Sequence, residues 1–104
     1  EYENLPTIIF DEIDTGVSGE IALKMADIMN SMSQNMQVIS ITHLPQIASK
    51  GRQHLKVLKN TNETTTETHI KHLNEQERII ELSQMLGGDK NSESAIAHAK
   101  NLLN

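Results

Sequence analysis

The side chains best suited to chemistry are Asp11 and Glu12, which directly follow the apolar run TIIF at residues 7–10. Open α/β sheets bind ligands at the carboxyl ends of their strands, which is where this pair falls. The first carboxylate can hold Mg²⁺, directly or through water, and the second can polarise the water that attacks a γ-phosphate. The structural alternative is a buried strand that ends in an acidic turn. Nucleotide chemistry is therefore a hypothesis for the rest of the chain to test.

A second polar group follows the next apolar run, where Thr42 and His43 come after residues 36–41. Parallel strands that flank one helix bring their carboxyl ends to the same edge of the sheet. We therefore expect Asp11, Glu12 and His43 to converge there. The alternative for His43 is a histidine that caps the turn after it.

The elements that must position these groups form a βαβ unit. The strand at residues 7–11 lacks polar alternation and is predicted to be buried on both faces of a parallel sheet. Ser18 is a good N-cap for a helix from Glu20 to about Ser33. The predicted inward face of this helix comprises Ile21, Met25, Ile28, Met29 and Met32. The second strand covers residues 36–42 and should run parallel to the first.

The rest of the sequence predicts a hairpin and helices. Pro45 should open a short helix that ends near Lys50 and Gly51. Strands are predicted at residues 53–59, with Leu55 and Val57 inward, and at the Thr-rich residues 64–73, which suit an exposed edge. A further helix should run from the Asn74 cap to Leu86, with Ile79, Leu82 and Leu86 inward and Gly87-Gly88 as its stop. A last helix should open at Ser92 or Ser94, and its apolar residues are Ala95, Ile96, Ala99, Leu102 and Leu103.

The bulk composition excludes several classes of site. The formal charge of −5 and the two aromatic residues argue against a nucleic-acid contact face. Absence of cysteine excludes disulfides and thiolate zinc sites, and His54, His69, His72 and His98 lack the spacing of a metal site. No apolar run has the roughly 20 residues of a membrane helix. The sequence begins with Glu1 and reaches a strand at once, so we expect a segment of a longer protein.

Together these motifs resemble the ATPases of the ABC and SMC type. The TIIFDE run is similar to a Walker B strand with its following glutamate, and Thr42-His43 is similar to the switch histidine of that class. Within the class, four stretches resemble the RecN family of bacterial DNA repair proteins. They are FDEIDTGVSG at 10–19, THLPQIA at 42–48, ERIIELSQMLGG at 77–88 and HAKNLL at 98–103. The resemblance covers nearly the whole chain.

This resemblance implies an α/β fold, the C-terminal lobe of a partial P-loop NTPase head of the ABC or SMC type. Residues 1–104 would form that single lobe, with a parallel βαβ core, a β-hairpin and two C-terminal helices. Asp11 would hold Mg²⁺ through water, Glu12 would be the general base, and His43 would sense the γ-phosphate beside Thr42. The D-loop, which faces a second head, would comprise Asp14, Thr15, Gly16 and Ser18. SMC relatives usually have Asp where this chain has Ser18, so Ser18 is expected mainly to cap the helix.

The resemblance also implies what this chain needs from outside. It contains no GxxxxGK[ST] phosphate loop and no LSGGE-type signature, so ATP and Mg²⁺ are expected only in the full-length protein. The implied partners are an N-terminal lobe of the same head and a second head, joined by ATP-dependent homodimerisation. DNA would be bound by the full-length protein, which would act in the cytoplasm at the nucleoid in double-strand break repair and recombination. The segment alone is expected to be inactive.

Three other interpretations remain open. Asp11-Glu12-Ile13-Asp14 also satisfies the DExD motif of superfamily 2 helicases, and Ser40-Ile41-Thr42 resembles their Ser-Ala-Thr motif. The residues after His43 are not those that follow in helicases. A transporter ATPase subunit is a weaker alternative, because its D-loop usually has the sequence Ser-Ala-Leu-Asp. The third is a docking or dimerisation module with vestigial carboxylates.

Overall fold

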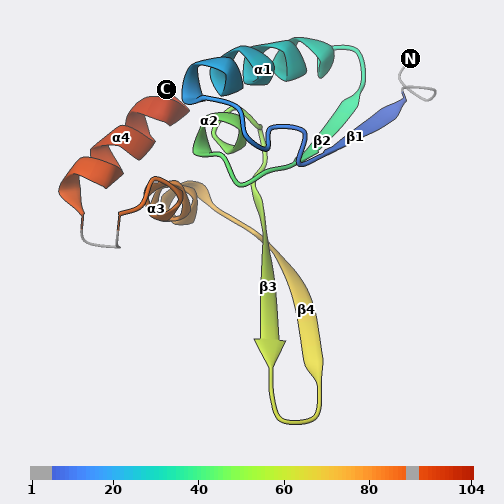
Figure 1. Cartoon of the computed structure of the whole chain (residues 1–104), viewed down its shortest axis with the longest axis vertical. Coiled ribbons are helices and arrows are strands. Elements are labelled where there is room, and N and C mark those ends of the chain that lie inside the picture. The colour runs from blue at the N-terminus through green and yellow to red at the C-terminus, as the bar shows by residue number, and fades with distance from the viewer. Residues whose placement is uncertain (1–5, 89–91) are drawn as a thin grey trace.

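A computed structural model of the chain describes residues 6–88 and 92–104 (Figure 1). The elements follow the predicted order. They are β1 (Thr7–Asp11), α1 (Gly19–Met32), β2 (Gln37–Ile41), α2 (Pro45–Ala48), β3 (Leu55–Thr61), β4 (Thr66–His72), α3 (Glu75–Met85) and α4 (Glu93–Leu103). Figure 1 shows the hairpin β3–β4 extending away from the helices.

The βαβ unit is confirmed. β1 and β2 pair in parallel with Thr7 opposite Gln37 and Asp11 opposite Ile41. The two strands therefore end at the same level, and the residues that follow them leave the sheet at one edge.

The prediction that β1 is buried on both faces is wrong. The strand alternates, with Ile8 and Phe10 half-buried and Ile9 60% exposed. Phe10 packs toward the core cluster under α1, while Ile9 lies on the opposite face with Ile39. The reason is that α1 and α2 cover one face of this two-stranded sheet, and no described element covers the other.

The buried face of α1 also differs from the predicted one. Ser18 caps the helix as predicted, its Oγ accepting a hydrogen bond from the Ile21 amide at 3.3 Å. The residues buried most deeply are Ala22, Ala26 and Met29, whereas Ile28 is 61% exposed. The two alanines lie on one helical face and are small enough for the helix to approach Phe10 and Ile47 closely. Periodicity alone did not identify this face, because large apolar residues also occur beside it.

The hairpin is antiparallel, with Val57 opposite Ile70. The prediction that Leu55 and Val57 point inward is wrong, since both are more than half exposed and Lys56 and Leu58 are the half-buried positions of β3. The face with Lys56 is the one that meets α3, through an ion pair to Glu81. The Thr-rich strand β4 is exposed at every position, as predicted.

The helical ends agree closely with the sequence. Pro45 opens α2, although the helix ends at Ala48, slightly before the predicted stop. Asn74 forms a capping box with Glu77, and Ser92 caps α4. Gly87 follows α3 with a φ of +93°, which glycine adopts without steric cost. None of the described helices is long and apolar enough to cross a membrane.

Candidate functional site

The two strand ends are joined beyond the sheet itself. The amide of Glu12 donates to the carbonyl of Ile41 at 2.8 Å, which continues the pairing by one residue. Glu12 therefore lies beside the chain that leads into Thr42 and His43. The predicted convergence of the two strand ends is a feature of the fold.

Glu12 and His43 contact each other directly. The Glu12 Oε1 lies 2.6 Å from the His43 Nε2, although the two residues follow different strands. The His43 side chain is 88% exposed and that of Glu12 is 46% exposed, so the pair adds little to stability. A carboxylate held by an imidazole can accept a proton from water or orient a water for attack.

The backbone of Glu12 has an unusual conformation. Its φ is +52°, the only positive value among the described non-glycine residues. A non-glycine residue in this left-handed region is uncommon and costs about 1 kcal/mol or more, and such residues cluster at functional sites. The turn is closed by Thr15, whose Oγ1 donates to the Glu12 carbonyl at 3.0 Å. The chain therefore turns immediately after β1, at the residue that contacts His43.

Asp14 and Thr42 form a second link between the two strand ends. The Thr42 hydroxyl donates to the Asp14 Oδ2 and accepts from the amide of Leu44 at 2.9 Å. Asp14 is buried, with 4% of its surface exposed. The carboxylate thus points into the protein, so in the predicted D-loop the exposed residues are Thr15, Gly16 and Ser18. The sequence placed Asp14 and Thr42 at adjacent strand ends, but their contact was not predicted.

Asp11 ends β1 with an exposed side chain. No group of three or more His, Cys, Asp or Glu residues that could hold a metal ion is present in residues 6–88 and 92–104. Mg²⁺ usually keeps several waters and is bound by one or two carboxylates together with phosphates of its substrate. A single exposed carboxylate at a strand end therefore fits Mg²⁺ carried by a nucleotide and does not fit a metal ion bound by the chain alone.

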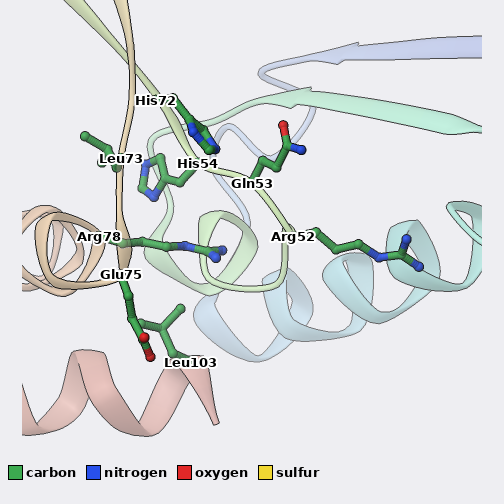
Figure 2. A pocket seen from close by; sticks show the side chains of 8 residues that line it. All are labelled: Arg52, Gln53, His54, His72, Leu73, Glu75, Arg78 and Leu103. Carbon is green, nitrogen blue, oxygen red and sulfur yellow. The ribbon is translucent and has the colours of Figure 1, made fainter.

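A cavity of about 340 Å³ lies at a different place (Figure 2). Its lining comprises Arg52, Gln53, His54, His72, Leu73, Glu75, Arg78 and Leu103. In Figure 2 the side chains of His54 and Arg78 lie near each other. Burial, and secondarily the charge of Arg78, lower the pKa of His54. None of the candidate site residues lines this cavity. The carboxylates of Asp11 and Glu12 lie instead on the exposed surface.

Comparison with known proteins places the chain in a family. It is 42% identical to the DNA repair protein RecN of Vibrio cholerae over 98 residues, which make up 94% of this chain and 18% of that protein. It is 40% identical to RecN of Bacillus subtilis over 101 residues, 97% of this chain and 18% of that protein. The RecN of Rickettsia conorii is 44% identical over 98 residues, 94% of this chain and 18% of that protein. No protein-family model matches the chain.

The fold has a solved counterpart. A structure described under "Structural biochemistry of ATP-driven dimerization and DNA stimulated activation of SMC ATPases" matches with a TM-score of 0.61, over 81% of this chain and 50% of that chain. The sequence identity is 17%, so this match shows the fold alone. It confirms the predicted α/β class with a parallel strand pair, a hairpin and C-terminal helices. The chain spans 18% of the length of these relatives, is a fragment of the RecN type, and shares its fold with half of an SMC ATPase structure.

Proposed function

We propose that the chain is the C-terminal lobe of an SMC-like ATPase head that supplies the hydrolytic residues to an ATP site. The observation that carries the proposal is the contact between Glu12 and His43 at the ends of two parallel strands. The RecN relatives are described as DNA repair proteins, and the matched fold comes from SMC ATPases. On this proposal the full-length protein hydrolyses ATP in the repair of DNA double-strand breaks and in recombination.

Each residue has one role in the proposed reaction. Glu12 is the general base, which holds the attacking water and accepts its proton. His43 holds the Glu12 carboxylate through Nε2 and responds to the γ-phosphate. Asp11, which is exposed, would hold Mg²⁺ through a water molecule. When bound, the ion neutralises charge on the β- and γ-phosphates.

The exposed turn after β1 is the proposed contact with a second head. Thr15, Gly16 and Ser18 are accessible there. Gly16 has a φ of +81°, and no atom lies within 4 Å of the position that a Cβ would take. Ser18 is committed to capping α1. Asp14 joins this turn to Thr42 beside His43, so a change in the turn would reach the histidine. ATP-dependent dimerisation of two heads is therefore proposed to act through the backbone of the turn.

The site needs a second lobe to become complete. The chain lacks a phosphate loop, and one face of its β1–β2 sheet exposes Ile9, Ile39 and Ile41. Apolar side chains that adjoin on an open sheet face usually meet another surface. We propose that the N-terminal lobe of the same head covers this face and grips the nucleotide. The sequence comparisons do not favour the helicase interpretation, because the similar sequences reported above are RecN proteins.

Replacement of Asp11 in the full-length protein tests the proposal. Asp11→Asn should abolish most Mg²⁺-dependent ATP hydrolysis, and added Mg²⁺ should no longer strengthen ATP binding. The control is Asp27→Asn, an exposed carboxylate on α1 that should have no effect. Steady-state hydrolysis and calorimetry with and without Mg²⁺ measure both quantities. Equal hydrolysis by Asp11→Asn and the unmodified protein would favour the docking module.

A further inference from the structure

Arg78 connects α3 to the end of α2. Its Nη2 lies 3.0 Å from the carbonyl oxygen of Ala48 and 3.2 Å from that of Ser49, and it also donates to the carbonyl of Gly51. These carbonyls belong to the C-terminal end of α2 and the turn after it, where helical carbonyls lack partners within the helix. A guanidinium is a strong donor for them and also complements the negative end of the helix. Arg78 thus joins α3 to the C-terminal end of α2 through three carbonyl groups.

His43 lies two residues before the opposite, N-terminal end of α2. The helix begins at Pro45, directly after Leu44, and no side chain caps it. Because α2 has four residues, it spans only about 6 Å. Pro45, Ile47 and Ser49 are buried, so the segment moves as a unit if its end moves. The Thr42 hydroxyl holds this segment on the side of His43, and Arg78 holds it on the other side.

The helix that carries Arg78 is itself anchored. Lys56 of β3 lies 2.6 Å from Glu81, and Lys71 of β4 lies 2.5 Å from Glu77. The two lysines are opposite each other in the hairpin, and the two glutamates lie one helical turn apart on α3. Leu82 of the same helix is fully buried. Partly exposed ion pairs contribute little to stability, so the buried Leu82 is the main anchor of α3 and holds the helix that carries Arg78.

We infer that Arg78 is a positioning residue for His43. It holds the C-terminal end of α2, and thereby keeps the histidine at the start of the same segment within reach of Glu12. The inference rests on the proposed role of His43 in ATP hydrolysis. It assigns no contact between Arg78 and the nucleotide.

The test uses steady-state and single-turnover ATP hydrolysis by the full-length protein. Arg78→Met should lower kcat by about 10- to 100-fold, as small displacements of catalytic groups do, and should leave the KM for ATP nearly unchanged. Arg78→Lys keeps the charge and a donor, so its kcat should lie between those of Arg78→Met and the unmodified protein. The control is Lys71→Met, which removes a contact to α3 without touching α2 and should keep the original kcat.

A double-mutant cycle separates positioning from a general structural effect. If Arg78 acts through His43, Arg78→Met should slow single-turnover hydrolysis in the original protein and have no further effect in His43→Ala. Equal slowing in both backgrounds would overturn the inference while leaving the proposed function intact. Unchanged hydrolysis by His43→Ala alone would overturn the proposed role of the histidine. If Arg78→Met fails to fold, Arg78→Lys gives the same cycle.

Discussion

Thr42→Val offers a test of how the two strand ends are joined. Valine has nearly the shape of threonine but lacks the hydroxyl that donates to Asp14 and accepts from the Leu44 amide. The substitution leaves a buried carboxylate and a backbone amide without these partners. Thr42→Ser, which keeps the hydroxyl and loses only a methyl group, is the matched control.

The expected cost follows from the two lost hydrogen bonds. A bond to a charged group contributes about 1.5–3 kcal/mol, and a backbone amide left without a partner adds about 1 kcal/mol or more. Thr42 is only half-buried, so water can replace part of this loss. We therefore expect local opening of the segment after β2 to become easier by about 2–3 kcal/mol, which corresponds to about 30- to 150-fold.

Hydrogen exchange followed by mass spectrometry measures this opening in the full-length protein. Peptides that cover residues 40–48 should exchange about 30- to 150-fold faster in Thr42→Val, whereas Thr42→Ser should be close to the unmodified protein. Exchange in α4 provides an internal reference and should not change. If Thr42→Val and Thr42→Ser exchange equally, the link between Asp14 and Thr42 does not hold the segment.

Three further predictions concern the support of the site. Leu82 is fully buried, so Leu82→Ala should destabilise α3 by about 2–5 kcal/mol, as measured by hydrogen exchange. Leu82→Met should cost less than about 1.5 kcal/mol. Equal effects of the two substitutions would contradict the burial of Leu82. Asn74→Ala removes the side chain that accepts from the Glu77 amide at 2.8 Å and should cost about 1 kcal/mol in the same assay, while Asn74→Asp should retain most of the cap. The pKa of His54 is lowered by burial, so the folded state favours the neutral ring. The neutral ring therefore contributes to the stability of the folded state above about pH 6.5, and this contribution is lost as the pH falls. The urea midpoint of the full-length protein should therefore fall less between pH 7.5 and 5.5 in His54→Gln, and an identical fall would refute this contribution.

The sequence predicted those parts of the fold that depend on residues close together along the chain. The caps at Ser18 and Asn74 act over three residues, and the strand–helix–strand order follows from local patterns. Parallel pairing then places Asp11 and His43 at one edge of the sheet, so their proximity could be predicted before any contact was known. The direct contact between Glu12 and His43 is consistent with that expectation.

The burial of individual faces could not be predicted in the same way. Ile9, Ile28 and Val57 are apolar but exposed, because their surroundings depend on which elements pack against them and not on their own spacing. The contacts of Asp14 with Thr42 and of Arg78 with Ala48 join residues 28 and 30 positions apart. Contacts between residues so far apart depend on how the elements pack. The positive φ of Glu12, in the turn that leads to Asp14, likewise has no reliable sequence signal.

Replacement of Glu12 by glutamine in the full-length protein is the most direct test of the proposed chemistry. Glutamine keeps the size of the side chain but cannot accept the proton of the attacking water, so kcat for ATP hydrolysis should fall by about 100-fold or more. ATP binding should persist and engaged head dimers should accumulate. The control Glu20→Gln, an exposed carboxylate in the first turn of α1, should hydrolyse ATP normally. Hydrolysis by Glu12→Gln at the rate of the unmodified protein would contradict the assignment of Glu12 as the base.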